Sequence, residues 1–129
     1  MRVVYDTNVL ATTFSSRSEI QRLKHAILSD RIMLITSSFI LNELETVLVS
    51  RFGLTRQSAK ARKNLLARIA EVVRVLNIEK VARDPDDDFV LATALAGHAN
   101  YILTHDKDLL VLNEYEGIKI VPPAVFWNN

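Results

Sequence analysis

The chain has 129 residues, no cysteine, a formal net charge of +1 and 49% hydrophobic residues. These values fit one globular domain with its own core, and they exclude disulfide frameworks, zinc–thiolate sites and thiol nucleophiles. No apolar run approaches the roughly 18 residues that span a membrane, and Asp6 interrupts the first apolar segment where a signal peptide would continue. We therefore expect residues 1–129 to form a single cytoplasmic domain without membrane contact.

Short apolar runs alternate with longer segments whose apolar side chains recur every three or four residues. The runs predict strands, and the spacing predicts helices with one buried face. The expected strands cover residues 2–5, 32–35, 101–104 and 118–121. The expected helices cover residues 9–14, 18–28, 39–48, 55–76, 84–96 and 105–112, and Ser18, residues 36–38, Thr55 and Asp84 are placed to begin four of them. Residues 75–78 form a linking or strand-like segment, and Pro122 and Pro123 end the last strand before a short tail.

This alternation predicts an α/β fold of three layers, with a parallel sheet covered by helices on both faces. Sheets of this kind bind their ligands beyond the carboxyl ends of the strands. Asp6 directly follows the first expected strand. It is therefore the first candidate member of an acidic site that holds a metal ion.

Glu43 and the acidic tract 84–88 are the next candidates. Glu43 shares a helix face with apolar side chains, where an unpaired charge is costly, although exposure at the rim of that face explains it equally well. The tract holds four Asp residues, more than a helix cap and the helix dipole require, and such close charges repel unless a cation neutralises them. Asp87 is spaced to face inward with its helix, whereas Asp88 points further round.

Asp106 and Asp108 complete the acidic set, because they follow the strand at residues 101–104. Oxygen ligands without cysteine or paired histidines suit Mg²⁺ or Mn²⁺, and such sites help a water molecule to attack phosphorus. We expect Asp6, Glu43, Asp87 and Asp106 to be both catalytic and metal-binding. Asn8, Thr104 and Asp108 are expected to orient these ligands.

Four motifs resemble the PIN-domain family: Val-Val-Tyr-Asp6-Thr-Asn8-Val-Leu, Asn42-Glu43-Leu-Glu45-Thr-Val-Leu, Asp84-Pro-Asp-Asp87-Asp-Phe-Val-Leu-Ala-Thr-Ala-Leu and Tyr-Ile-Leu-Thr104-His-Asp106-Lys-Asp108-Leu-Leu. The chain is similar to the VapC-like bacterial toxins of type II toxin–antitoxin systems over nearly its whole length. The resemblance implies about five parallel strands in the order 3-2-1-4-5 and a Mg²⁺- or Mn²⁺-dependent ribonuclease whose acidic residues map onto Asp6, Glu43, Asp87 and Asp106. It also implies a homodimer and a separately encoded antitoxin. Family spacing favours Asp87 over Asp88.

Charge is distributed unevenly along the chain. Residues 51–83 carry nine basic side chains and two acidic ones, whereas residues 84–129 carry two basic and eight acidic side chains. This distribution is typical of a cation site beside a surface for a polyanion, although a well-solvated helix beside an acidic loop explains it equally well. Arg56, Lys60 and Lys63 recur at helical spacing and could follow an RNA backbone, although a solvated helix face explains them equally well.

Two other functions remain open from the sequence. A phosphohydrolase with an aspartyl-phosphate intermediate would use Asp6 as its nucleophile, but such enzymes need a carboxylate two residues later, where Asn8 stands. A non-catalytic PIN-like module that binds RNA or protein also fits the fold, although the complete acidic set argues against it. An endoribonuclease that cleaves RNA phosphodiesters, and acts as a toxin, is the leading hypothesis.

Overall fold

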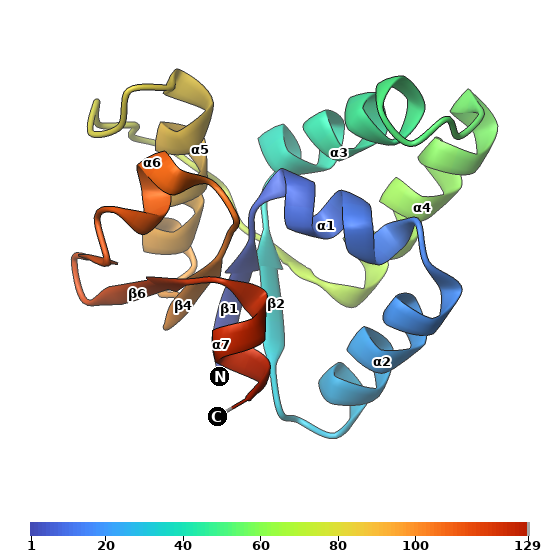
Figure 1. Ribbon diagram of the computed structural model, residues 1–129, viewed down its shortest axis with the longest axis horizontal. Coiled ribbons are helices and arrows are strands. Elements are labelled where there is room, and N and C mark those ends of the chain that lie inside the picture. The colour runs from blue at the N-terminus through green and yellow to red at the C-terminus, as the bar shows by residue number, and fades with distance from the viewer. Residues whose placement is uncertain (129) are drawn as a thin grey trace.

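Six strands form one sheet in the order β3-β2-β1-β4-β6-β5 in the computed structural model, which describes residues 1–128 and leaves Asn129 outside the description (Figure 1). The strands are β1 (Arg2–Tyr5), β2 (Met33–Thr36), β3 (Glu71–Val72), β4 (Tyr101–Leu103), β5 (Glu114–Tyr115) and β6 (Ile118–Val121). All are parallel to their neighbours except β5, which pairs with β6 in the antiparallel direction. The predicted α/β fold and the order 3-2-1-4-5 are confirmed, with β6 as the fifth parallel strand and β5 as an added edge strand.

Helices flank the sheet, and Figure 1 shows α5 and α6 to the left of the central strands and α1 to α4 to their right. The helices are α1 (Thr7–Phe14), α2 (Arg17–Leu28), α3 (Ser38–Ser50), α4 (Arg56–Ile69), α5 (Pro85–Ala96), α6 (Lys107–Leu110) and α7 (Pro123–Trp127). Within residues 1–128, none of these helices has the length and apolar character needed to cross a membrane.

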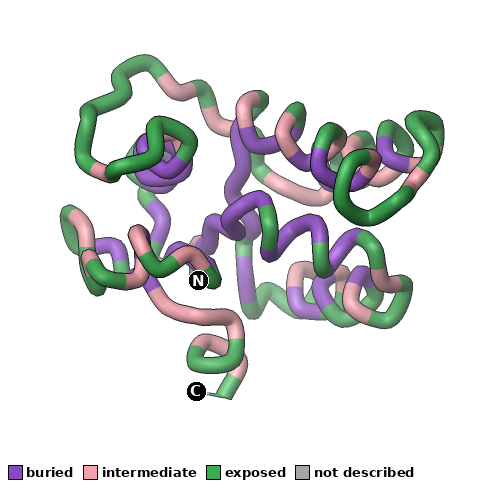
Figure 2. Tube along the Cα trace, turned by 45° about the horizontal axis from the view of Figure 1, so that its top comes forward, coloured by how far each residue is buried: buried purple, intermediate pink, exposed green. Residues whose placement is uncertain are grey.

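The core lies around β1, the central strand. Val3, Val4 and Tyr5 are all buried, because a parallel strand with helices on both faces has no solvent side. Figure 2 shows that burial continues along β2 and through most of α5, while the loop before α5 is largely exposed. A buried, continuously apolar strand therefore leads directly to Asp6.

The predicted helix over residues 55–76 is wrong beyond Ile69. Ala70 has an extended backbone, and Val73 N–H donates to the Thr36 carbonyl at 2.8 Å, so the chain leaves the helix to add a strand beside β2. Val72 and Leu76 are 47% and 77% exposed, so they do not continue the buried helix face. A local pattern could not reveal this, because β3 exists only through its pairing with β2.

Two smaller differences concern helix starts and the tail. Ser16, not Ser18, accepts a hydrogen bond from the Glu19 N–H at the start of α2. The tail after Pro122 forms the short helix α7, with Pro123 at its first position, where the absence of an N–H costs nothing. The tail thereby places Trp127 against the body of the domain.

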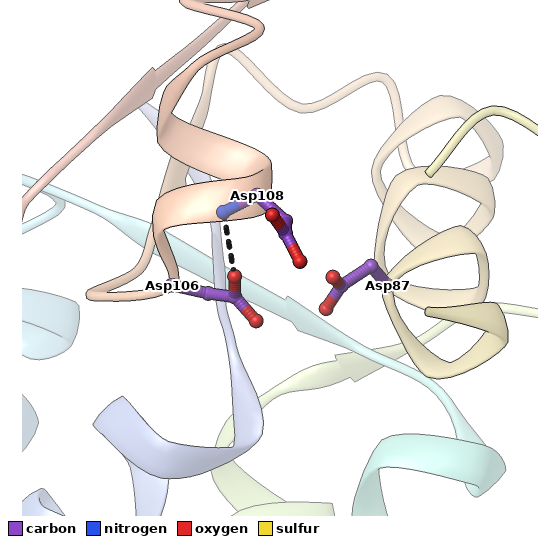
Figure 3. A group of neighbouring side chains, drawn as sticks. All are labelled: Asp87, Asp106 and Asp108. Carbon is purple, nitrogen blue, oxygen red and sulfur yellow. Dashed lines mark hydrogen bonds between the residues drawn. The ribbon is translucent and has the colours of Figure 1, made fainter. Parts of the chain in front are cut away.

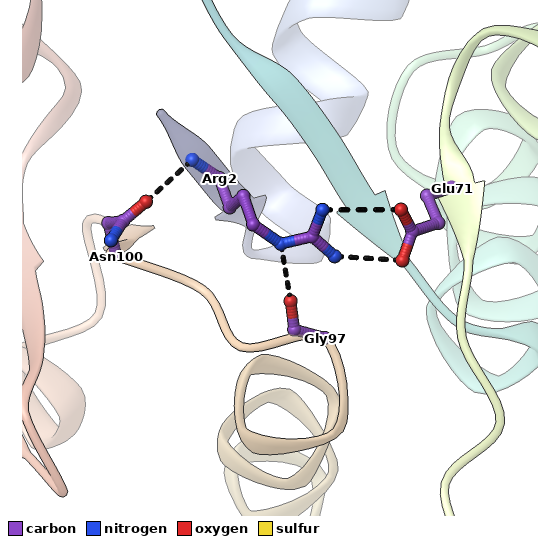
Figure 4. Close-up of polar contacts among 4 residues, drawn as sticks. All are labelled: Arg2, Glu71, Gly97 and Asn100. Carbon is purple, nitrogen blue, oxygen red and sulfur yellow. Dashed lines mark hydrogen bonds and ion pairs between the residues drawn. The ribbon is translucent and has the colours of Figure 1, made fainter.

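Arg2 joins three segments at the end of the sheet where β1 begins (Figure 4). Its guanidinium forms a two-pronged contact with the Glu71 carboxylate, with N–O distances of 2.8 and 3.3 Å, and its Nε donates to the Gly97 carbonyl at 2.7 Å. Its backbone N–H donates to Asn100 Oδ1 at 2.8 Å. A bidentate pair of this kind fixes geometry as well as adding energy. It holds β3 and the end of α5 in place relative to β1.

Gly97 offers a test of packing at the end of α5. A Cβ added there would lie 2.4 Å from Ile35 Cγ2, and Ile35 is only 1% exposed, so it has little room to move. We expect Gly97→Ala to lower the free energy of unfolding by about 1–3 kcal/mol, measured by urea denaturation. Ala96→Ser, at the exposed neighbouring position, is the control and should change stability by less than about 0.5 kcal/mol. Equal stability of the two variants would contradict this packing.

Candidate active site

An acidic cavity of about 130 Å³ opens at the carboxyl ends of β1 and β4, next to the first turn of α5. It is lined by Asp6, Thr7, Asn8, Glu43, Val47, Arg51, Asp84, Asp86, Asp87 and Asp106. The structure thus brings together all four carboxylates that the sequence suggested as ligands. They come from four separate segments of the chain.

Asp6 is held rigidly at the floor of this cavity. It is 7% exposed, its Oδ2 accepts a hydrogen bond from Thr104 Oγ1 at 2.8 Å, and its Oδ1 accepts one from the Thr7 N–H at 2.7 Å. Burial raises the pKa of Asp6, and these two hydrogen bonds oppose the rise. Thr104 Oγ1 also accepts from the Asp106 N–H at 2.9 Å. One threonine therefore links the ends of β1 and β4.

Glu43 reaches the cavity from α3. Thr7 Oγ1 donates a hydrogen bond to Glu43 Oε1, so Thr7 contacts two of the carboxylates at once. Burial raises the pKa of Glu43, the Thr7 bond lowers it, and the neighbouring Asp86 raises it again. Glu43 is half-buried, which is intermediate between the buried and the rim positions that its sequence allowed.

Asp87 and Asp88 have different partners. Asp87 is 4% exposed, lines the cavity, and its Oδ2 has no hydrogen-bond partner among the described residues. Burial, followed by the charges of Asp106 and Asp6, raises the pKa of Asp87 to about 7. Asp88 Oδ1 instead accepts from the N–H groups of Val81 and Ala82 at 3.0 and 2.8 Å. Asp87 therefore faces the acidic cavity, while Asp88 anchors the loop before α5.

Asp87, Asp106 and Asp108 each present a carboxylate oxygen within 4.8 Å of the other two. Figure 3 shows Asp87 and Asp108 pointing toward one another from α5 and α6, with Asp106 beside them. The Asp108 N–H donates to Asp106 Oδ1 at 2.8 Å, which leaves the other oxygen of Asp106 available. Three hard oxygen ligands and an unsatisfied buried oxygen on Asp87 fit a divalent cation such as Mg²⁺ or Mn²⁺. Asp108, expected only to orient ligands, lies where it could bind the ion itself.

Arg51 is a cavity residue that the sequence analysis missed. It follows α3 directly, lines the acidic cavity and donates from its guanidinium to Asn8 Oδ1 at 3.2 Å. The available signal was its spacing, since Glu43, Val47 and Arg51 lie four residues apart on one helix face. Thr7 was also missed as a lining residue, and Asp84 and Asp86 line the cavity although only Asp87 was singled out from their acidic tract.

The basic residues expected to follow RNA do not line this cavity within the described part of the chain. Lys63 Nζ binds Glu45 Oε1 and Asn42 Oδ1, each at 2.9 Å, and this pairing lowers the pKa of Glu45. Arg56 and Lys60 are exposed on α4. Their contact with RNA stays a prediction.

Comparisons with known proteins agree with this architecture. The sequence model of the PIN domain family matches residues 2–108. The fold is similar to that of VapBC2 from Rickettsia felis, solved bound to a DNA fragment from its promoter, with a TM-score of 0.62 and 14% identity over 93% of this chain and 97% of that one. It is also similar to VapC20 from Mycobacterium tuberculosis, a sarcin–ricin loop cleaving toxin, with a TM-score of 0.60 and 16% identity over 91% and 98% of the two chains. No curated protein sequence matches the chain. The region matched by the family contains every carboxylate described above.

Proposed function

The chain belongs to the PIN domain family, and from this membership we propose that it is a Mg²⁺- or Mn²⁺-dependent endoribonuclease. The observation that carries the proposal is the convergence of Asp6, Glu43, Asp87 and Asp106 on one cavity, with an oxygen of Asp87 left unsatisfied. So many carboxylates in one small cavity repel one another unless a bound cation offsets their charge.

Asp87, Asp106 and Asp108, whose oxygens lie within 4.8 Å of one another, would hold the ion. Asp6 and Glu43 would add their carboxylates from the same acidic cavity. A bound divalent cation supplies positive charge that offsets the carboxylates and stabilises the charge developing on the cleaved phosphodiester. Thr104 and Thr7 fix the Asp6 carboxylate, and Thr7 also directs Glu43 into the cavity. Asn8, bound to Arg51, keeps the guanidinium at the cavity, where it is placed to bind a phosphate oxygen of RNA.

Cleavage assays with purified protein test this proposal directly. Single-stranded and structured RNAs should be cut internally in Mg²⁺ or Mn²⁺, and EDTA should stop the reaction. Asp6→Asn should remove activity, whereas Asp30→Asn, an exposed position remote in sequence from the site, should retain it. Cleavage that persists in EDTA, or an active Asp6→Asn variant, would overturn the proposal.

The biological setting is a further part of the proposal. Two solved structures with a similar fold are the VapBC2 complex and the toxin VapC20. Their similarity supports the proposal that this chain is a cytoplasmic toxin with a cognate antitoxin. We also propose that residues 1–129 form one PIN-like domain that works as a homodimer. Expression of the chain in a bacterial host should arrest growth, and co-expression of a small protein encoded beside its gene should restore it. Normal growth in cells that contain active nuclease would contradict the toxin role.

A further inference from the structure

A second cavity, of about 280 Å³, adjoins the acidic one. Tyr5 and His105 line it, while the residues that follow them, Asp6 and Asp106, line the acidic cavity. Helix α1 is shared in the same way, with Thr7 and Asn8 on the acidic side and Val9, Thr12 and Thr13 on the other. At both strand ends, consecutive residues of the chain therefore line the two cavities.

The second cavity has flat aromatic surfaces and polar groups in place of clustered carboxylates. Trp127 lines it, with the guanidinium carbon of Arg22 lying 4.6 Å from the centre of an indole ring. Tyr5 is only 3% exposed, so its ring is packed in the wall of the cavity and leaves Trp127 and Arg22 as the flat surfaces open to a ligand. Among residues 1–128, Glu19 is the only carboxylate that lines the cavity, and it pairs with Arg22 at 3.7 Å. The described lining therefore has no excess of negative charge to repel an RNA chain.

Polar side chains surround these aromatic surfaces. His105, Thr12 and Asn128 also line the cavity, and all three are exposed at its edge. These three side chains offer hydrogen-bond donors and acceptors around a flat space. This combination suits a nucleobase, which is flat on its faces and polar at its edges. Proteins recognise unpaired bases by stacking them on aromatic rings or guanidinium planes and by bonding their edges.

We propose that this cavity binds one nucleobase of the RNA, from a nucleotide adjoining the phosphodiester held at the acidic cavity. The inference rests on the proposed function for its substrate, and it adds a site that would select among bases. Its volume lies just below the about 300–1,000 Å³ of pockets for drug-sized ligands, so it fits one base and not a longer stretch. His105 is thereby assigned to base contact, since it lines this cavity and not the acidic one.

Trp127 provides the measurement, because it is the only tryptophan in the chain and lines the cavity. Its fluorescence would be titrated with the four nucleoside 5′-monophosphates, and with ribose 5-phosphate as a probe without a base, all in EDTA so that no cleavage occurs. We expect a saturable change with at least one nucleotide and none with ribose 5-phosphate. An equal response to ribose 5-phosphate would mean a phosphate site and would overturn the proposal, as would no response to any nucleotide.

Variants locate the binding. His105→Ala should weaken nucleotide binding by about 2- to 13-fold, the range for loss of one hydrogen bond to the base edge, whereas His25→Ala, an exposed histidine on α2 outside the cavity, should leave it unchanged. Thr12→Val should alter the preference among the four nucleotides, and circular dichroism would verify that each variant folds. If His105→Ala does not fold, His105→Gln replaces it. Unchanged binding in both cavity variants would overturn the proposal.

The two functional proposals fail separately. Binding in EDTA does not depend on cleavage. A protein that binds nucleotides through His105 but cleaves no RNA would contradict the nuclease proposal and support the base site. A protein that cleaves RNA in Mg²⁺ or Mn²⁺, but whose Trp127 fluorescence does not change with nucleotides, would contradict the base site and support the nuclease proposal.

Discussion

Asp87→Asn is expected to reduce RNA cleavage by about 100-fold or more while leaving the metal-free protein at least as stable as the wild type. The loss follows because Asn cannot supply the negative charge that the cation requires, and a single electrostatic group of this kind is typically worth about 100- to 1,000-fold in rate. The gain in stability follows because the Asp87 carboxylate is buried among other carboxylates and one of its oxygens has no hydrogen-bond partner within residues 1–128. Most substitutions of buried residues lower both properties, so this combination is diagnostic.

Asp88→Asn is the matched control, one residue away on the same helix. The charged Asp88 carboxylate accepts two backbone hydrogen bonds from the loop before α5, so the variant should lose about 1–3 kcal/mol of stability. Its activity, measured where it is fully folded, should stay within about tenfold of the wild type. Both variants would be assayed for kcat/KM on one RNA and for urea unfolding in EDTA. If Asp88→Asn abolished cleavage and Asp87→Asn did not, the assignment of the two residues would be reversed.

Without divalent cations, the protein should become less stable as the pH rises from about 4 to 7. The pKa of Asp87 is raised from its ordinary value of 3.8 to about 7 by burial and neighbouring carboxylates, so in this window the folded state binds a proton that the unfolded state has released. The contribution of protonated Asp87 to the free energy of unfolding is therefore fully present below about pH 4 and is lost as the pH rises through about 7. One group contributes at most about 1.4 kcal/mol per pH unit, and solvent at the cavity mouth reduces this value.

Other groups shape the curve at lower pH. The pKa values of Asp6 and Glu43 are also raised, so they act in the same direction, whereas those of Glu45 and Glu71 are lowered by Lys63 and Arg2 and act in the opposite one. The difference between the wild type and Asp87→Asn isolates the Asp87 contribution. Unfolding in EDTA would be followed by urea denaturation at several pH values between about 4.5 and 7.5, which cover the Asp87 transition.

Mn²⁺ or Mg²⁺ should reverse this trend. A cation at 100 times its dissociation constant adds about 2.7 kcal/mol of stability, and it should add more at pH 7, where the ligands are ionised, than near pH 5. Asp87→Asn should lose most of this increment. Wild-type stability that increases steadily with pH in EDTA, or a cation effect that does not depend on pH, would contradict a metal site built around Asp87.

Local sequence signals were sufficient for the central strand and the acidic residues. The apolar run before Asp6 predicted β1, and Asp84 followed by Pro85 predicted the start of α5, because strand burial and helix capping depend on adjacent residues. The spacing of Asp87 with its apolar helix face likewise placed it inward, where the structure has it. These features need no knowledge of distant contacts.

Features that depend on distant contacts could not be predicted. The end of α4 is decided by the pairing of β3 with β2, which no pattern in residues 70–76 encodes. The partners of Asp88 could not be predicted either, because they are the N–H groups of Val81 and Ala82 in the loop before α5. The base-sized cavity depends on α7 folding back so that Trp127 meets Arg22, and the tail alone gave no sign of it.

The hydrogen bond between Thr104 and Asp6 spans 98 residues of sequence, which has a consequence for synthesis. At about 5–20 residues per second, roughly 5–20 s separate the emergence of Asp6 from that of Thr104 during translation. Throughout that interval β1 lacks its β4 neighbour, and Asp6 lacks the threonine that orients it. The acidic site is therefore not assembled until synthesis of the chain is nearly finished. Under the proposed function, an antitoxin synthesised at the same time has this interval in which to fold.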